Sequence, residues 1–428
     1  MLQSFYTAFT GLSADKDWLS VISDNIANVN TVGFKAERAV FEDLLSRSLT
    51  TFKNGAPVNR EVGGGVFVSA TVKDFSQGTF KNTNNPLDLA LDGEGFFMVK
   101  DKSGVTYYTR NGEFRLDANG DLINMLGMKV QGWKLDENGN MAGSIGAINI
   151  PMGMDPKGTT KMSFEEPTNL DSRSPVISSS FDVNDSNTYN YVNSVTVYDS
   201  LGNPHTLSFY FVHKGANQWE VHAILDDDSS SDKTLNITFN SDGKIKSASD
   251  GTNTATYTYN NGKQTKSGKD PQLSFDLSNG ASTPLSITVS FDSMRQLASD
   301  FIFYAQQDGN SKGDLMSIAV SEDGTIKATY TNGKVKDIAR LAVATFKDKE
   351  MLVRKGSWLY VPNLQTFTPV IMPGGVISKV RSGMLEMSNV DIANEFINLI
   401  TAQRTYQANA RVITTDDQIL QETMNIKR

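Results

Sequence analysis

The chain has 428 residues, room for about three ordinary domains, and its 40 Lys and Arg residues against 48 Asp and Glu residues give a net charge of −8, which disfavours nucleic acid as a partner. It contains no cysteine, so disulfides, thiolate nucleophiles and cysteine-bound metal centres are all excluded. No apolar run reaches the ~18 residues of a membrane span, and the first residues have neither the basic nor the apolar region of a signal peptide, so we expect no membrane insertion and no secretion by the ordinary route.

The first thirty residues predict an amphipathic helix. Apolar side chains recur at steps of three and four residues, which is the a/d pattern of a heptad repeat, and Lys16 and Ser23 fill the two missing positions. Such a stripe needs a partner that covers it. Its members are Leu2, Phe5, Phe9, Leu12, Leu19 and Ile26.

The middle of the chain predicts β structure. Its pattern changes to a period of two, and Asp-Gly and Asn-Gly turn signals separate short runs rich in Val, Ile, Thr, Tyr and Phe. From Ser317 to Phe346 this pattern predicts three strands in a meander. Residues 151–284 differ from their flanks in their many Ser, Thr, Asn and Asp residues, and we interpret them as an inserted outer domain. Gly- and Pro-rich segments at 31–72 and 363–388 predict irregular connectors.

The C-terminal segment, from about Asn389 to Ile426, predicts one long helix. It carries a second heptad stripe, broken only by polar Gln403 and Asp417. We expect the two stripes to pair with each other; the alternative is that each helix packs on its own neighbouring domain. The C-terminal stripe consists of Ile392, Phe396, Leu399, Tyr406, Ala410, Ile413, Leu420 and Met424.

The expected fold is mainly β with long terminal α-helices, arranged as nested discontinuous domains. Two β domains would accompany a paired-helix coiled-coil core domain, because the chain must run outward and then return. The expected parts are a terminal helical core of residues 1–30 and 389–428, connectors of 31–72 and 363–388, a first β domain of 73–150 and 285–362, and the insert of 151–284.

Two stretches match parts of catalytic or phosphate-binding motifs without the context that those motifs need. Gly309-Asn-Ser-Lys-Gly313 has the spacing of a hydrolase nucleophile elbow, but a strand is expected after it and no histidine follows His222. Gly262 to Gly268 has five residues between its glycines where a phosphate loop has four, and Asp270 where that loop has Ser or Thr. We therefore predict no catalytic residue and no cofactor.

Two further groups of residues were weighed as metal sites. Asp117-x-Asn119-x-Asp121 begins like a calcium loop, but Leu122 and Met128 stand where that loop needs Gly and Glu, so a hairpin turn is preferred. The histidines lack a third ligand at a recognisable spacing and are interpreted as surface or half-buried strand residues. No metal site is predicted. The three histidines are His205, His213 and His222.

Several strings are similar to those of one family, the axial rod and hook proteins of the bacterial flagellum. These strings are Ile22–Lys35, Gln77–Ala90, Gly93–Phe97, Tyr108–Phe114, Gly383–Asp391 and Leu399–Arg411. The family signature carried over onto this chain comprises Asn25, Asn28, Asn30, Gly33, Phe34, Asn85, Pro86, Asn389, Asp391, Gln403, Arg404 and Asn409.

The resemblance implies a structural subunit, not an enzyme, that polymerises with copies of itself into a curved, hollow hook. In such assemblies the terminal helices form a coiled-coil tube around an export channel, the first β domain forms a shell and the second lies outermost. The hook is a flexible universal joint that transmits torque from rod to filament. The resemblance also implies an extracellular location in the flagellar hook and basal body, type III export without a cleavable signal peptide, and as partners the distal rod protein, the hook cap, the hook-filament junction proteins and the export apparatus.

Two alternatives stay open at this point. The distal rod protein shares the end motifs, but it looks like this chain with most of residues 151–290 missing, and Asp199–Leu207 resembles a string typical of the hook members. A secreted β-rich adhesin or binding module is the alternative from another class. An adhesin has no need of paired terminal heptads and is expected to carry an export signal or anchor.

Overall fold

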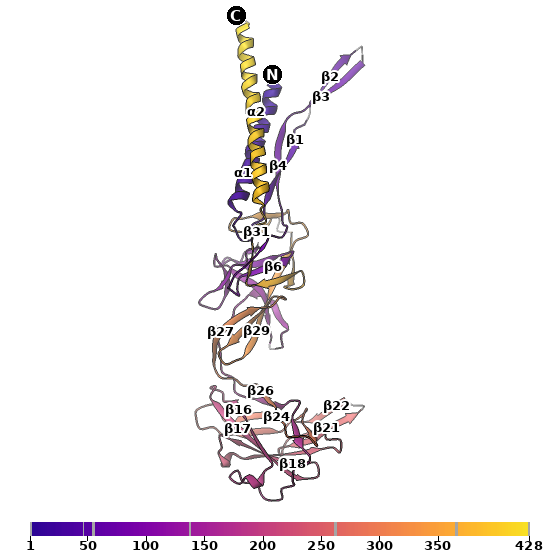
Figure 1. Ribbon diagram of the computed structural model, residues 1–428, viewed down its shortest axis with the longest axis vertical. Coiled ribbons are helices and arrows are strands. Elements are labelled where there is room, and N and C mark those ends of the chain that lie inside the picture. The colour runs from indigo at the N-terminus through magenta and orange to yellow at the C-terminus, as the bar shows by residue number, and fades with distance from the viewer. Residues whose placement is uncertain are drawn as a thin grey trace. The chain divides into compact units, whose positions relative to one another are not determined.

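The computed structural model describes residues 2–45, 47–53, 56–136, 138–260, 263–363 and 367–426. The fold is mainly β with one long helix near each end, α1 (Leu2–Ala27) and α2 (Ile392–Ile426), as the sequence predicts (Figure 1). The chain divides into two compact units, each assembled from segments that are distant in sequence. The first unit is Met1–Pro151, Ser317–Ala328 and Val335–Arg428, and the second is Met152–Met316 and Thr329–Lys334.

In the first unit, α1 and α2 lie side by side and run antiparallel. Near one end the Ser4 hydroxyl donates to Asp416 (2.7 Å), and near the other the Asn25 amide donates to Glu395 (3.1 Å). Asp391 caps α2, because its carboxylate accepts the backbone N–H of Ala393 (2.9 Å). With 35 residues, α2 is about 52 Å long. Its last turns therefore extend past the start of α1.

The segment after α1 forms two antiparallel ribbons, which corrects the expectation of an irregular connector at 31–72. β1 (Glu37–Asp43) pairs with β4 (Val66–Lys73), and β2 (Arg47–Lys53) pairs with β3 (Ala56–Val62). The ring of Trp18 in α1 packs edge to face on the ring of Phe41 in β1, with 5.5 Å between the ring centroids. Pro57 is compatible with β3, because a ribbon of only two strands leaves one side of each strand unpaired and tolerates proline.

The connector expected at 363–388 also contains strands, and these return the chain to α2. β33 (Ser378–Ser382) pairs with β6 (Leu89–Gly93), and β34 (Met384–Glu386) pairs with β5 (Phe80–Asn82). Each pair joins a segment that follows α1 to a segment that precedes α2. The return path of the chain is therefore held by backbone hydrogen bonds.

The main sheet of the first unit has the order β27-β28-β29-β11-β7-β8-β31-β30. The expected meander after Ser317 is confirmed as β27–β29, and the expected hairpin at Asp117 joins β9 to β10. Phe96, Tyr108, Phe346 and Tyr360 are buried together in its core. Bounds are β7 Phe96–Lys100, β8 Thr106–Thr109, β9 Phe114–Leu116, β10 Leu122–Asn124, β11 Lys129–Leu135, β12 Met141–Ala147, β27 Gly313–Val320, β28 Thr325–Tyr330, β29 Val335–Thr345, β30 Leu352–Arg354, β31 Leu359–Pro362 and β32 Val370–Pro373.

The second unit consists of a seven-stranded meander, β16 to β22, and a four-stranded sheet of order β23-β24-β14-β26. Their apolar side chains, Phe164, Trp219 and Phe291 among them, form one buried cluster. The parallel pair β15–β25 completes it. Bounds are β13 Gly153–Met154, β14 Lys161–Phe164, β15 Asn169–Asp171, β16 Tyr191–Tyr198, β17 Pro204–Gly215, β18 Gln218–Leu225, β19 Lys233–Phe239, β20 Ile245–Ser249, β21 Thr254–Asn260, β22 Lys263–Gly268, β23 Gln272–Phe275, β24 Leu285–Ser290, β25 Arg295–Leu297 and β26 Ala305–Gln307.

The second unit continues to Met316, whereas the sequence placed the end of the insert at residue 284. β24 pairs with β14 and β23, so the strand at 285–290 belongs to the sheet of this unit. The residues between β23 and β24 form a loop inside the unit, and a loop in the sequence does not tell which sheet the next strand will join.

Candidate functional site

The terminal helices expose large apolar side chains along their length. Phe9 is 58% exposed and Met424 is 74% exposed, although both carry side chains that gain free energy on leaving water. An apolar surface of this kind marks an interaction site. We call it the exposed apolar surface; its members are Phe5, Tyr6, Phe9, Ile392, Phe396, Ile397, Ile400, Tyr406, Val412, Ile419, Leu420 and Met424.

The face that the two helices share, here called the seam, is built from small and polar residues instead. Ala8, Gly11 and Ala402 are buried there, and the Asn409 amide donates to the Asp15 carboxylate (2.9 Å). A Cβ atom on Gly11 would lie 2.8 Å from the Asn409 amide nitrogen, so glycine permits this close approach of the helices. On α1, Ser4, Gly11, Asp15 and Asn25 contact α2, and the buried Ala8 and Ile22 share their spacing of three and four residues; on α2 the seam includes Glu395, Ala402, Asn409 and Asp416.

The expectation that the two apolar stripes face each other is therefore corrected. Each seam position on α1 comes one residue before a position of the predicted stripe, a rotation of about 100° around the helix. Phe5 and Phe9 are exposed, while Leu12, Leu19 and Ile26 are half-buried; the side chain of Leu2 lies outside the described part. On α2 the exposed members are Ile392, Phe396, Tyr406, Leu420 and Met424, and the half-buried ones are Leu399, Ala410 and Ile413.

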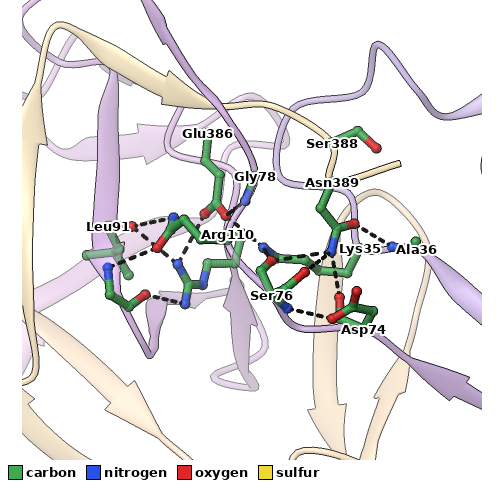
Figure 2. Close-up of polar contacts among 12 residues, drawn as sticks. Lys35, Ala36, Asp74, Ser76, Gly78, Leu91, Arg110, Glu386, Ser388 and Asn389 are labelled. Carbon is green, nitrogen blue, oxygen red and sulfur yellow. Dashed lines mark hydrogen bonds and ion pairs between the residues drawn. The ribbon is translucent and has the colours of Figure 1, made fainter. Parts of the chain in front are cut away.

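Close in sequence to the end of α1 and the start of α2, three buried charged residues form what we call the polar junction (Figure 2). Lys35 follows α1, Arg110 follows β8, and Glu386 ends β34 shortly before α2. The Lys35 ammonium donates to Glu386 Oε1 (2.7 Å), and the Arg110 guanidinium donates to Glu386 Oε2 (3.1 Å). One carboxylate thus joins both ends of the chain to the β sheet.

The surrounding backbone completes this junction, as Figure 2 shows. Lys35 also donates to the Ser76 carbonyl (2.6 Å), and the Gly78 N–H donates to Glu386 (2.9 Å). Burial lowers the pKa values of Lys35 and Arg110, although the negative charge of Glu386 opposes the shift. The side chains of Lys35 and Glu386 are fully buried, so water does not solvate their charges. Each charge is stabilised instead by the opposite charge and by its hydrogen bonds.

Four family-signature residues lie at or beside the polar junction. Asn25 donates to the Glu37 carbonyl (2.7 Å) and accepts the Glu37 N–H (2.9 Å), which fixes the chain as it leaves α1. Asn389 accepts the N–H of Ala36 (2.8 Å) just before α2 begins. Gly33 has a φ of 70°, and its N–H donates to the Glu386 carbonyl (2.8 Å). Phe34 is buried, and the guanidinium carbon of Arg354 lies 5.4 Å from the centroid of its ring.

The other signature residues lie elsewhere. Asp391 caps α2 and Asn409 belongs to the seam, while Gln403 and Arg404 are exposed on α2. Asn85 and Pro86 form a separate turn with Asn85 donating to Asp88 (2.9 Å), Asn28 bonds to Asp24, and Asn30 is exposed. The signature therefore does not form one site.

The structure also shows functional residues that the sequence analysis did not select. Lys35, Arg110 and Glu386 all lie inside the family strings, but none was chosen. The available signal was a charged residue inside a family string, but each string holds a second one, Asp24, Glu113 or Asp391, so the signal does not single out the junction.

The described ranges contain no group of three or more His, Asp or Glu residues placed to hold a metal ion. β27 follows Ser311, as expected, and Gly262 of the phosphate-loop comparison lies outside the described residues. Neither described helix combines the length and the hydropathy of a membrane span.

Sequence models of four protein families match successive parts of the chain. Together they cover both ends and most of the middle. The matches are "Flagella basal body rod protein" at residues 5–35, "Flagellar hook protein FlgE/F/G D1 domain" at 90–166, "Flagellar basal body protein FlaE D2 domain" at 169–310 and "Flagellar basal body rod FlgEFG protein C-terminal" at 381–426.

Individual proteins match along their whole length. The flagellar hook protein FlgE of Salmonella typhimurium is 34% identical, with 99% of this chain and 100% of that protein covered. The FlgE proteins of Escherichia coli and Borreliella burgdorferi are 32% and 31% identical, with at least 99% of this chain and 100% of each relative covered. A crystal structure of Helicobacter pylori flagellar hook protein FlgE2 is similar with a TM-score of 0.48 at 15% identity, over 72% of this chain and 100% of that one.

Proposed function

The chain belongs to the flagellar hook protein family and is a structural subunit of the bacterial flagellar hook, and from this premise we propose that its copies polymerise through the exposed apolar surface. The exposed apolar surface is the observation that supports this proposal. Its side chains lie on the two helices, and in the described part of one chain they remain in water. Burial of apolar surface is worth about 25 cal/mol per Å², so a tube of such helices gains free energy from every subunit added.

The contact that we propose is between unlike surfaces. A patch that meets a different patch on the next copy repeats without closing, and this produces a helical polymer. The seam is consistent with that arrangement, because it is already occupied within each chain and leaves the larger apolar side chains for neighbours. The helix pairs would form a coiled-coil core around the hook's central channel.

We further propose a nested arrangement in the assembled hook. The helices would lie innermost, the β sheet of the first unit would form a shell, and the second unit would lie outside. The order of the chain supports this, since the second unit is inserted between parts of the first. Polar, hydrated contacts between outer units would allow sliding during bending better than dry apolar contacts.

The partners and the route of export follow from the family as proposals. We expect the subunit to pass through the flagellar export channel and to meet the distal rod protein, the hook cap and the hook-filament junction proteins. A chain without cysteine needs no disulfide to fold after that passage. The distal rod protein is not favoured, because the hook relatives match at full length and the D2 model matches residues 169–310.

Electron microscopy of salt-induced polymers tests the proposal. Purified full-length chain should assemble into hollow, curved tubes. A matched chain without residues 1–30 should not, because it lacks α1 and its part of the exposed apolar surface. Amorphous aggregate from the full chain, or normal tubes from the truncated chain, would contradict assembly through the terminal helices.

A further inference from the structure

His205, on β17 of the second unit, lies between two carboxylates from different turns. Its Nδ1 atom is 2.6 Å from Asp226 Oδ2, and its Nε2 atom is 3.4 Å from Asp199 Oδ2. Asp199 belongs to the turn between β16 and β17, and Asp226 to the turn after β18. A ring that donates to both carboxylates needs a proton on each nitrogen, which is the charged form of histidine.

The two carboxylates are held very differently. Asp199 is fully buried and accepts the N–H groups of Leu201 and Asn203 (both 2.9 Å) and the side-chain amides of Asn203 (2.8 Å) and Asn279 (2.7 Å). Asp226 has a side chain that is 48% exposed, and besides the ring it accepts only the Thr206 N–H (2.8 Å) among the described contacts. Asp199 therefore cannot turn away from the ring, whereas Asp226 can turn into water.

The turn that carries Asp226 is in an unfavourable conformation. Asp226 has a φ of 53° and Asp227 a φ of 60°, both in the left-handed region that costs free energy for residues other than glycine. Asp228 follows directly, so three carboxylates are adjacent. A cationic ring at Asp226 offsets both the strain and the repulsion between these charges.

We propose that His205 is a proton-dependent clasp: the doubly protonated ring holds the Asp226 carboxylate close to the Asp199 turn, and the neutral ring releases that carboxylate, while the backbone of the Asp226–Asp227 turn stays bonded to Thr206 and Leu225. When one proton is lost, one ring nitrogen presents a lone pair to a carboxylate. Of the two carboxylates, only that of Asp226 can then turn into water, because Asp199 is held by four other donors. The charged groups that face the ring are these two aspartates, and its cross-strand neighbour on β16 is the uncharged Val197.

The direction of the pH dependence follows from the same contacts. Burial lowers the pKa of His205, but hydrogen bonds to Asp226 and Asp199 more than offset this, so the pKa lies above its ordinary value. A raised pKa means that the clasp contributes fully at acidic pH and is lost as the pH rises through that pKa. The contact with Asp226 should therefore be closed at acidic pH and should open as the pH rises through the raised pKa of His205.

Nuclear magnetic resonance on the full-length monomer tests the clasp. The chain has only three histidines, so 13C-labelled histidine gives three ring signals, which His→Gln variants assign. 15N-labelled threonine reports Thr206, whose N–H donates to Asp226. We expect the His205 signal to titrate with a midpoint above the ordinary histidine value and the Thr206 amide to shift with the same midpoint.

Single-residue variants distinguish the titration of His205 from that of other groups. Asp226→Asn should lower the midpoint of His205, and His205→Gln should abolish the matching shift of Thr206. His222→Gln is the control; its ring lies 2.9 Å from Asp232 in the same unit, and it should leave the Thr206 titration unchanged. A His205 midpoint at or below the ordinary value, or a Thr206 shift that persists in His205→Gln, would overturn the proposal. Hook assembly can succeed or fail independently of this result.

Discussion

Glu386 illustrates how much a single residue holds in place in this fold. It accepts hydrogen bonds from two buried cations, and its own carbonyl accepts the Gly33 N–H. A buried ion pair gains little over an apolar alternative, but removal of one partner leaves an uncompensated buried charge. Here removal of the single anion would leave two cations without a counterion.

We therefore expect Glu386→Gln to destabilise the monomer by about 3–5 kcal/mol. Urea unfolding measures this loss. Glu322→Gln is the matched control, because Glu322 is an exposed glutamate that also contacts two cations, Lys379 and Arg381, and its loss should change stability little. If the two variants lost similar amounts of stability, burial of the polar junction would not explain the effect of Glu386→Gln.

Gly11 gives a second prediction at this scale. A side chain there meets Asn409 across the seam, so Gly11→Val should push the helices apart and break the bond from Asn409 to Asp15. Overpacking of this kind costs roughly 1–3 kcal/mol. Hydrogen exchange of the α1 amides should speed up. Ser13→Val introduces the same side chain at an exposed position of α1, and equal effects from the two would contradict the close seam.

At the scale of elements, the sequence predicts the helices well and their shared face poorly. Periodicity locates an apolar stripe on each helix but does not tell what covers it. In the structure the seam uses residues such as Ala8, Gly11 and Asn409, whose side chains are small or polar and stand out less in a hydrophobic pattern than Leu or Phe. The larger apolar side chains beside them remain exposed.

The polar junction was less predictable for a different reason. Lys35, Arg110 and Glu386 are 75 or more residues apart in sequence, and nothing local indicates that one carboxylate will serve two cations. The ribbon β1–β4 was not predicted, because the Gly and Pro residues of the segment 31–72 indicate irregular structure, whereas the structure places Gly63–Gly65 between β3 and β4. Both the polar junction and the ribbon β1–β4 depend on contacts between residues that are distant in sequence, which a local pattern does not predict.

Leu420 tests the exposed apolar surface. It lies on the part of α2 that extends past the start of α1, and it is 40% exposed. Leu420→Asp should prevent tube formation, because a buried, unpaired charge would cost several kcal/mol per subunit in the polymer. The monomer should unfold as before, since Leu420 is exposed in the described part of the single chain.

The control for that experiment is Gln418→Asp, which places the same charge on a different face of the same turn. It should leave assembly largely intact. If Leu420→Asp lowered monomer stability instead, α2 would depend on Leu420 for packing within its own chain, and the surface would not be free for a second copy.

At the scale of the whole molecule, the two ends of the second unit come together within one short antiparallel pair. Gly153 of β13 pairs with Asp314 of β27, and the Leu315 N–H donates to the Met152 carbonyl (2.9 Å). Paired residues in such a ladder are about 5 Å apart. A linker of a few residues can therefore replace everything from 152 to 316.

We expect a chain that joins Pro151 to Ser317 through a short Gly/Ser linker to fold, to be exported and to form tubes that are straighter than those of the full chain. The helices, the polar junction and the core around Phe96 all remain, whereas the outer contacts that would select among lattice spacings are lost. A few kcal/mol of bias is enough to switch such an interface. Tyr330→Thr should accompany the deletion, because this buried ring belongs to the second unit.

Electron microscopy of the polymers decides this prediction, with a full-length chain that carries a Gly-Ser insertion after Pro151 as the control for the linker itself. Tubes of normal curvature from the deleted chain would remove the second unit from the bending mechanism. A deleted chain that failed to fold would refute the nested arrangement, because the first unit would then depend on the segment inserted into it. Straight tubes from the deleted chain and curved tubes from the control would assign curvature to contacts between outer units, since the helices and the junction are identical in both.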